Sequence, residues 1–311
     1  MNDKLITLIG GGGFLGRYVA QALLSAGARV RIAQRNPGAA LAIKPLGALG
    51  QTQFVAADIC RPQSLARAVH GADAVVNLVG ILKGNFTAIH EEGAANVARA
   101  AAAAGTAALV HVSAIGADAH SLSAYGRSKA AGEAGVQAAF AGATIVRPSL
   151  IFGREDEFVN RFARMIAAAP LVPVIKPDVR FQPIFVADVA AAIARALAEP
   201  ASHAGRIYEL GGPDILSMEA LIRWIAGAIG RQPKIVPLPD ALSAMIARAG
   251  FLPGAPLTWD HWQMLQNDNV ATAGMAGIAA FDISPTPLAV VAPNWLAAYR
   301  KHGRFAAVMA R

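Results

Sequence analysis

Residues 6–16 read Ile-Thr-Leu-Ile-Gly-Gly-Gly-Gly-Phe-Leu-Gly, and this stretch decides the fold that the sequence predicts. A short apolar run, typical of a buried strand, breaks into four consecutive glycines, and an apolar helix-forming segment, Phe14–Leu24, begins at once. Glycine suits such a turn because it adopts backbone angles closed to other residues, and because a bare backbone lets a diphosphate approach the first N–H groups of a helix. The stretch therefore predicts a dinucleotide-binding turn.

The four glycines allow two registers of the phosphate-binding pattern. Gly11, Gly13 and Gly16 give G-x-G-x-x-G, whereas Gly10, Gly13 and Gly16 give G-x-x-G-x-x-G. The motifs later in the chain favour the second register. The residues of this turn that we expect to contact the cofactor are Gly10, Gly13, Phe14, Leu15, Gly16 and Arg17.

The composition describes a folded, positively charged chain. Of its 311 residues, 55% are apolar and 15% are charged, which excludes a disordered chain. The formal net charge of +8 suits anionic partners such as cofactor phosphates, an acidic protein face or an anionic lipid surface. No run of arginines and aromatic residues resembles a nucleic-acid module, and no apolar run reaches the ~18 residues of a spanning helix. We therefore expect no nucleic-acid partner and no transmembrane segment.

Cysteine, histidine and the N-terminus add three further expectations. The single cysteine, Cys60, excludes an intramolecular disulfide and favours a buried structural thiol. The seven histidines are dispersed without metal-ligand spacing, so we expect no metal site. The first expected strand follows Met-Asn-Asp-Lys, which leaves no room for a secretory signal and predicts a cytoplasmic protein.

Short apolar runs alternate with helical stretches from residue 5 to about residue 150. Such alternation predicts an α/β protein with a Rossmann, doubly wound parallel sheet, whose ligand lies at the carboxyl ends of the strands. The expected strands are Leu5–Ile9, Ala28–Ala33, Gln53–Ala57, Ala74–Leu78, Leu109–Ser113 and Ala143–Val146, with helices centred near Ala20, Leu65, Asn96 and Ala131.

The residues after the second strand indicate the kind of dinucleotide. Gln34-Arg35-Asn36 carries no carboxylate for a ribose 2′-hydroxyl, whereas Arg35 and Arg17 are placed to flank a 2′-phosphate. The pattern favours NADP(H) over NAD(H). An ordinary solvated arginine is the alternative interpretation of Arg35.

The residues after the third and fourth strands complete the expected nucleotide site. Asp58 is placed to accept a hydrogen bond from the adenine amine while Ile59 covers the ring, although Asp58 also suits an N-cap of the Pro62–Val69 helix region. After the fourth strand, Val79 and Gly80 bring the backbone close to a ribose, and Gly80 also suits a simple turn.

The helix expected after the fifth strand carries the chemistry. Tyr125 and Lys129 lie four residues apart, so both side chains project from one face. An ammonium near a phenol stabilises the phenolate, and it can also hold ribose hydroxyls. The pair predicts an acid/base function for Tyr125, with Ser113 or a neighbouring hydroxyl orienting a carbonyl.

Together with Arg147-Pro-Ser-Leu-Ile-Phe-Gly153, these motifs resemble the extended or atypical short-chain dehydrogenases/reductases. The resemblance implies that Pro148 directs the main chain of Ser149 and Leu150 toward the nicotinamide amide. It also implies a serine or threonine after the fifth strand, but the family's register places Ala114 there instead of Ser113. This departure favours a structural cofactor over reductase chemistry.

Two longer segments narrow the resemblance. Ile151–Ala163, which contains Phe-Gly-Arg-Glu-Asp, and Phe181–Val189 are similar to the NADPH-binding accessory subunit of respiratory complex I (NADH:ubiquinone oxidoreductase) and its bacterial relatives. The resemblance implies a tightly held NADPH, complex I subunits as partners, and a role in assembling or stabilising a membrane-bound quinone reductase. The rival hypothesis is an active NAD(P)H-dependent oxidoreductase or epimerase acting on a small carbonyl, quinone or sugar.

The chain is expected to divide discontinuously. Arg206–Leu210 predicts one more strand of the sheet, so residues 1–153 and about 181–213 form the expected NADP(H)-binding domain. Residues of about 154–180 and 214–311 then form a smaller, mostly helical part for substrate or partner, with helices near Met218–Ile229 and Ala241–Ala249.

The tail from Asn294 to Arg311 interleaves aromatic and basic residues. Such a composition suits peripheral contact with an anionic inner-membrane surface, although a solvated terminal helix explains it as well. The aromatic residues concerned are Trp295, Tyr299 and Phe305.

Overall fold

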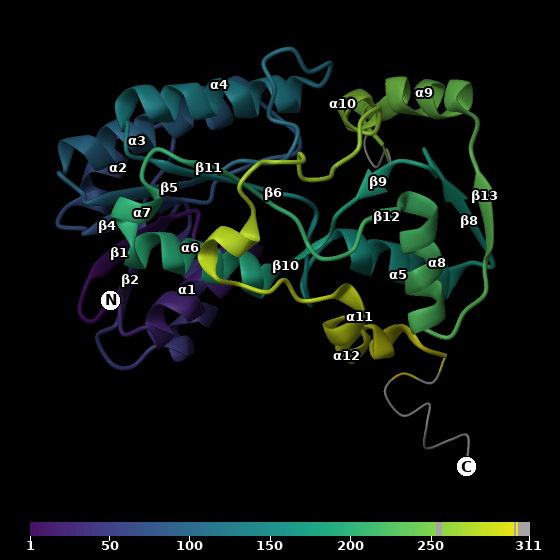
Figure 1. The fold of residues 1–311 in the computed structure, drawn as a ribbon, viewed down its shortest axis with the longest axis horizontal. Coiled ribbons are helices and arrows are strands. Elements are labelled where there is room, and N and C mark those ends of the chain that lie inside the picture. Colours follow the sequence, from purple (N-terminus) through teal and green to yellow (C-terminus); the bar gives the residue numbers. More distant parts are fainter. Residues whose placement is uncertain (253–256, 302, 304–311) are drawn as a thin grey trace. The chain divides into compact units, whose positions relative to one another are not determined.

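The computed structural model describes residues 1–252, 257–301 and 303, and the chain divides into two compact units (Figure 1). The first unit comprises Met1–Pro148, Val186–Leu210 and Thr272–Ser284. The second comprises Ser149–Phe185, Gly211–Ala271 and Pro285–Arg311. The segment Thr272–Ser284, which the sequence assigned to the smaller part, thus groups with the sheet.

Seven parallel strands form the sheet of the first unit, in the order β11-β6-β5-β4-β1-β2-β3. The expected α/β class with a Rossmann sheet is confirmed. The order reverses between β1 and β4, and open α/β sheets bind ligands at the carboxyl side of such a switch point. The strands are β1 (Leu5–Ile9), β2 (Arg29–Gln34), β3 (Thr52–Ala56), β4 (Ala74–Asn77), β5 (Ala108–Val112), β6 (Thr144–Pro148) and β11 (Ile207–Leu210).

Helices cover both faces of this sheet (Figure 1). One face carries α1 (Phe14–Ser25) and α6 (Val186–Ala198), and the other carries α2 (Pro62–Val69), α3 (Gly93–Ala103) and α4 (Ala124–Ala139). The α3 sequence explains its packing, because its small apolar side chains recur at the spacing of one helix face and are all buried. These residues are Ala94, Val97, Ala98 and Ala101.

The remaining helical segments of the first unit are short. A ten-residue 3-10 segment, η1 (Pro37–Leu46), follows β2, and α7 (Pro200–His203) follows α6. The segment η2 (Thr87–Glu92) is π-helical and runs directly into α3. A further 3-10 turn, η4 (Ile278–Phe281), packs the ring of Phe281 on Tyr208 of β11.

The second unit is largely helical around its own apolar core. Three short strand pairs, β7–β10, β8–β13 and β9–β12, link its segments. Its strands are β7 (Ile151–Phe152), β8 (Leu171–Val174), β9 (Arg180–Phe181), β10 (Ile184–Phe185), β12 (Leu216–Ser217) and β13 (Lys234–Pro237). Its helical segments are α5 (Phe158–Ala168), α8 (Met218–Ala228), α9 (Asp240–Arg248), η3 (Ala249–Phe251), α10 (Trp259–Met264), α11 (Leu288–Val291), α12 (Pro293–Leu296) and η5 (Ala297–Tyr299).

The described part of the tail packs onto the second unit. Trp295 is only 9% exposed and belongs to the core of this unit, and Tyr299 packs against the same core while its hydroxyl donates to Asn160 Oδ1 at 3.0 Å. These two rings are therefore held by protein contacts, which differs from the interfacial arrangement expected for them. Phe305 and the last basic residues lie outside the described part of the chain. Within that part, every helix is too short or too polar to cross a bilayer.

Candidate nucleotide-binding site

The three glycines of the favoured register differ in their backbone geometry and surroundings. Gly10 has a φ of +79°, which lies in the left-handed region that favours glycine. A Cβ at Gly16 would collide with the Gly11 main chain, so α1 can approach the turn only without a side chain there. Gly13 has an ordinary φ of −74°, and a Cβ there would have one atom within 4 Å, Gly10 O at 3.5 Å.

Gly13 is also the N-cap of α1, and it is exposed. Bare main chain therefore lies at the positive end of a helix dipole, beside the first unpaired N–H groups. This surface fits an anionic diphosphate. Phe14 and Leu15, in the first turn of α1, are half-buried.

The end of β2 holds the glycine turn in place. The Gly12 N–H donates to Gln34 Oε1 at 3.0 Å, and Gln34 Nε2 donates to the Asn36 carbonyl at 2.6 Å. Arg17 and Arg35, the two residues expected near a 2′-phosphate, are both exposed. The β2 end thus presents one cation, Arg35, and the Gln34 amide, without a carboxylate, while Arg17 lies on α1.

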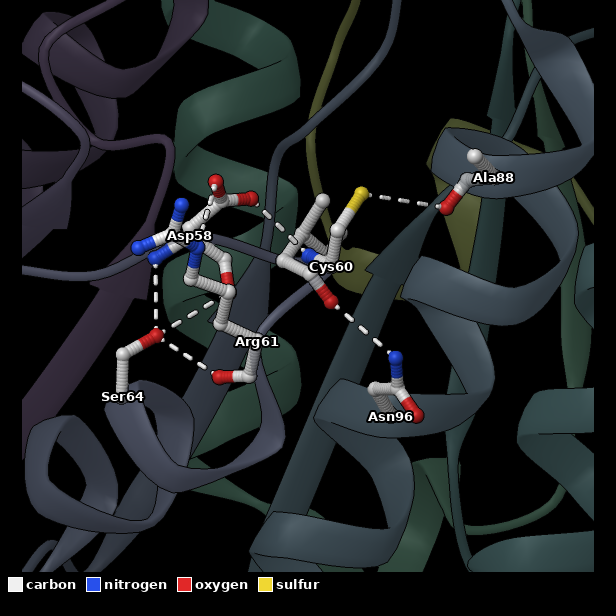
Figure 2. Close-up of polar contacts among 7 residues, drawn as sticks. Asp58, Cys60, Arg61, Ser64, Ala88 and Asn96 are labelled. Atoms are coloured by element: carbon white, nitrogen blue, oxygen red, sulfur yellow. Dashed lines mark hydrogen bonds and ion pairs between the residues drawn. The ribbon is translucent and has the colours of Figure 1, made fainter.

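Asp58 lies just after β3, where its carboxylate organises the loop (Figure 2). Its Oδ1 accepts from the Cys60 N–H at 2.9 Å, and its Oδ2 lies 3.9 Å from Arg61 Nε. The N-cap of α2 is Arg61, so the alternative interpretation of Asp58 as that cap is wrong. Ser64 closes the loop by accepting from the Asp58 N–H at 3.0 Å.

Ile59 and Cys60 differ from their expected environments. The Ile59 side chain is 5% exposed and packs in the core formed with α2 and α3, whereas it was expected to cover the adenine ring. Its carbonyl accepts from Asn96 Nδ2 at 3.2 Å (Figure 2). Cys60 is exposed, so the expectation of a buried thiol is wrong. Partial desolvation and the Asp58 carboxylate raise the pKa of this thiol, which disfavours the reactive thiolate.

The segment after β4 lies against the glycine turn. A Cβ on Gly10 would stand 2.8 Å from Val79 Cγ2, which shows how closely the two segments approach. The Val79 N–H donates to Asn77 Oδ1 at 3.2 Å, and Gly80 is exposed. The structure therefore brings Val79 and the glycine turn together at the switch point.

Tyr125 and Lys129 both project from α4. Tyr125 lies in the first turn, half-buried, after the N-cap Ser123, whose side chain accepts from the Gly126 N–H. Lys129 is 4% exposed, and its Nζ donates to the Val112 carbonyl at 2.9 Å. Burial lowers the pKa of Lys129 to about 8, although the Glu133 carboxylate opposes this shift. Lys129 is therefore buried against β5, and its ammonium group loses its proton more readily than that of an exposed lysine.

Ser113 follows β5 on the buried side of the strand. It is 5% exposed, and its hydroxyl has no hydrogen-bond partner among the described residues. Two residues earlier, His111 accepts from Asn77 Nδ2 at Nδ1, and burial lowers its pKa well below the usual range. Ala114, the residue expected at the family's hydroxyl position, is partly exposed and carries no hydroxyl.

His90 is a site residue that the sequence did not single out. It lies on η2, is 2% exposed, and packs edge-on against the Tyr125 ring with 5.4 Å between ring centroids. Its ring nitrogens contact Ser128 Oγ at 2.9 Å and the Ile81 N–H at 3.0 Å. His90 and its α4 partner Ser128 lie 38 residues apart in the sequence, so no local motif could have identified the pair.

A buried ion-pair network supports α4 from behind. Arg147 of β6 donates to both carboxylate oxygens of Glu133, at 2.9 and 2.6 Å, and lies 3.4 Å from Glu209 of β11. Glu209 also accepts from the Thr272 N–H at 2.7 Å. The hydrogen bonds that Arg147 donates to Glu133 raise the pKa of the Arg147 guanidinium. The network joins α4, β6, β11 and the returning segment 272–284.

Pro148 ends the first unit, and Ser149 and Leu150 belong to the second. The Ser149 hydroxyl lies 2.7 Å from Asn269 Oδ1, and the Leu150 N–H donates to the same oxygen at 3.1 Å. The Leu150 carbonyl accepts from the Ile184 N–H at 2.9 Å. Protein partners therefore occupy the Leu150 main-chain groups that were expected to face a nicotinamide amide.

The sheet order, the glycine turn and the Tyr-x-x-x-Lys helix together define an extended short-chain dehydrogenase/reductase type of Rossmann protein. The chain belongs to the NAD dependent epimerase/dehydratase family, whose model matches residues 6–211. The described residues offer no cluster suited to a metal ion.

Several named proteins are similar to this chain over most of its length. The mitochondrial NADH dehydrogenase [ubiquinone] 1 alpha subcomplex subunit 9 of Mus musculus is 34% identical over 93% of this chain and 78% of that protein. A ceramide reductase of Caulobacter vibrioides is 31% identical over 85% of this chain and 80% of that protein. An NADPH-dependent quinone oxidoreductase from Escherichia coli, solved with NADPH, has a TM-score of 0.75 and 22% identity, covering 91% of this chain and 97% of that one. This last likeness concerns the fold.

Proposed function

We propose that this chain binds NADP(H) as a mainly structural ligand and serves as an accessory subunit of a membrane-bound NADH:quinone oxidoreductase. The observation that carries the proposal is the bare, exposed N-terminus of α1 at Gly13. The 34% identity to the mouse complex I subunit supports the choice of partner. Such partners would hold the chain on the cytoplasmic side of the inner membrane, where its net charge of +8 favours an anionic surface.

A structural role for the cofactor is supported by the two residues directly after β5. Ala114 offers no hydroxyl, and the Ser113 hydroxyl is buried. A ligand that binds only the folded state stabilises it by mass action, by about 2.7 kcal/mol at 100 times its Kd. The cofactor can therefore contribute to assembly without reacting.

The preference for NADP(H) over NAD(H) rests on Arg35 and Arg17. We expect Arg35→Asp to weaken NADPH binding at least ~10-fold and NADH binding much less, because a phosphate–guanidinium hydrogen bond is lost and a like charge is introduced. Isothermal titration with both nucleotides measures this. Arg164→Asp changes the net charge equally at an exposed position of the second unit and is the matched control. Equal losses for both nucleotides would contradict the assignment.

Three measurements test the main proposal. The purified chain should retain a nucleotide identifiable as NADP(H) by mass spectrometry, and added NADPH should raise its melting temperature. Affinity isolation from membranes should recover quinone-reductase subunits, and less of them with a variant that cannot hold the nucleotide. A chain that retains no nucleotide, gains no stability from NADPH and recovers no respiratory subunit would refute the proposal.

A second candidate function is a reductase. Tyr125 and the buried Lys129, whose pKa is lowered to about 8, favour it, since this pair suits proton transfer to a carbonyl or quinone oxygen. The ceramide reductase relative supports a lipid carbonyl as one substrate class. Oxidation of NADPH with quinones, small ketones, sugar nucleotides and ceramide-type lipids tests it. Turnover that Tyr125→Phe abolishes would establish the reductase, and no turnover across the panel would exclude these substrates.

A further inference from the structure

His90 connects three separate parts of the first unit. Its Nε2 accepts from the Ile81 N–H, which belongs to the segment that follows Val79 and Gly80. Its Nδ1 lies 2.9 Å from Ser128 Oγ on α4. The plane of its ring stands at 88° to that of Tyr125. Because the His90 ring is 2% exposed and contacts all of these partners, its orientation is fixed.

The hydrogen bonds fix the tautomer of His90. An amide N–H only donates, so Nε2 carries no proton and the ring proton lies on Nδ1. Nδ1 then donates to Ser128, and the Ser128 hydroxyl donates to the Tyr125 carbonyl at 2.8 Å. Burial, together with the Lys129 ammonium, lowers the pKa of His90 to about 4. The ring therefore stays neutral, and the chain of donors keeps its direction, throughout the neutral pH range.

The backbone around His90 is adapted to this position. The π-helical turn Thr87–Glu92 is a rare geometry that occurs frequently at functional sites. Gly132 of α4 lies against the His90 carbonyl, where a Cβ would collide with the oxygen. Phe86 stacks on the imidazole at 5.3 Å and meets the Tyr125 ring edge-on at 6.0 Å. Phe86, His90 and Tyr125 thus form one ring cluster.

We propose that His90 is a positioning residue for Tyr125: it anchors the first turn of α4 through Ser128 and holds the phenol ring edge-on in one orientation. This role rests on the proposed function only in that Tyr125 belongs to the nucleotide site. It applies equally to a structural cofactor and to a reductase, because both need the phenol in a fixed place.

Fluorine NMR of the full chain labelled with 3-fluorotyrosine tests the proposal. The chain has four tyrosines, and the Tyr125 resonance is the one that Tyr125→Phe removes. His90→Phe keeps an aromatic ring in the cluster but loses both hydrogen bonds, so the Tyr125 resonance should shift or split. Ser128→Ala removes the link between His90 and the α4 turn but leaves the ring contact of His90 with Tyr125, and it should cause a smaller shift.

Val30→Ala is the control for general destabilisation, because Val30 is fully buried in β2 and removal of its methyl groups loosens the same unit. Its Tyr125 resonance should stay unchanged. An unmoved resonance in both His90→Phe and Ser128→Ala would overturn the proposal, as would an equal shift in Val30→Ala. If His90→Phe fails to fold, Ser128→Ala decides. Spectra taken without nucleotide keep this outcome separate from NADPH binding, whose absence would refute the proposed function alone.

Discussion

At the scale of single residues, the site depends on where a side chain is absent. Gly13 and Gly16 belong to the same motif, but a methyl group would make only an ordinary contact with Gly10 O at the first and would collide with the Gly11 main chain at the second. We therefore expect the first glycine to matter for the ligand and the second for the fold. This difference leads to opposite predictions for two otherwise identical substitutions.

We expect Gly13→Ala to destabilise the nucleotide-free protein by less than ~1 kcal/mol, because φ at this position suits any residue and only the N-cap preference for glycine over alanine is lost, and to weaken NADPH binding at least ~10-fold. Gly16→Ala should instead destabilise the nucleotide-free fold by ~1–3 kcal/mol, since its Cβ overlaps Gly11. Thermal scans with and without NADPH measure both effects. A Gly13→Ala protein that NADPH stabilises as well as the parent would disprove the assignment of Gly13.

Lys129 gives a pH-dependent prediction. Its pKa in the folded chain is about 8, below the ordinary value of 10.5, so the unfolded chain binds more protons between these values. Stability should therefore rise with pH across this window, by at most ~3 kcal/mol, and the penalty should be fully present below pH 8. Urea unfolding from pH 7.5 to 10 measures the slope. Lys129→Met should remove this part of the slope, and a parallel slope in parent and variant would contradict the lowered pKa.

At the scale of elements, one face of α4 contacts three different parts of the first unit. Tyr125, Lys129 and Glu133 recur every four residues on one face, where they reach the ring cluster, β5 and Arg147 in turn. Ser128 and Gly132 lie beside that face and contact η2. The sequence reveals the spacing, but the partners come from other strands and helices.

The Arg147 network should be essential for holding α4 to the sheet. Arg147→Met leaves two buried carboxylates without their cation, and we expect a loss of ~3–5 kcal/mol at pH 7. Arg195→Met breaks an exposed pair with Glu199 and should cost less than ~1 kcal/mol. Equal losses in the two variants, measured by urea unfolding, would contradict the importance of burial.

At the scale of the whole molecule, the two units report on different events. All four tryptophans, Trp224, Trp259, Trp262 and Trp295, belong to the second unit, whereas the glycine turn and Tyr125 belong to the first. Tryptophan fluorescence therefore follows the second unit, and a nucleotide effect on the first requires a probe that resolves individual segments.

Hydrogen–deuterium exchange provides that probe. NADPH should slow exchange at residues 10–17, 58–60 and 79–81, since these segments lie at the carboxyl ends of β1, β3 and β4. The Leu150 amide should change little, because it already donates to Asn269. Protection confined to the second unit would refute the site. A large change at Leu150 alone would instead support the expected contact between the Leu150 main chain and the nicotinamide amide.

The local signals in the sequence were sufficient for much of this architecture. The helix at Pro62–Val69 has the expected bounds, and the six strands of the alternating region lie within two residues of their expected positions. The strand near Arg206–Leu210 joins β6 in the sheet as expected. These elements follow from apolar periodicity and turn residues, which act over a few neighbouring positions.

Environments set by distant residues were not predictable in this way. Cys60 is exposed because its loop leaves the core after β3, and Trp295 is buried because the tail returns to the second unit. Neither residue type nor spacing reveals which other segment covers a side chain. For the same reason, the assignment of segment 272–284 to the sheet unit required the structure.

The sequence by itself determined the Rossmann class, the glycine turn and the Tyr125–Lys129 pair, because each follows from local patterns: the alternation of short segments along the chain, one turn, and one helix. Only the tertiary structure decided that Gly13 leaves an open surface, that Lys129 is buried against Val112, and that His90 packs on Tyr125. Burial and hydrogen bonding across tens of residues set those properties. The four consecutive glycines predict a nucleotide, and the contacts around α4 set the positions of Tyr125 and Lys129.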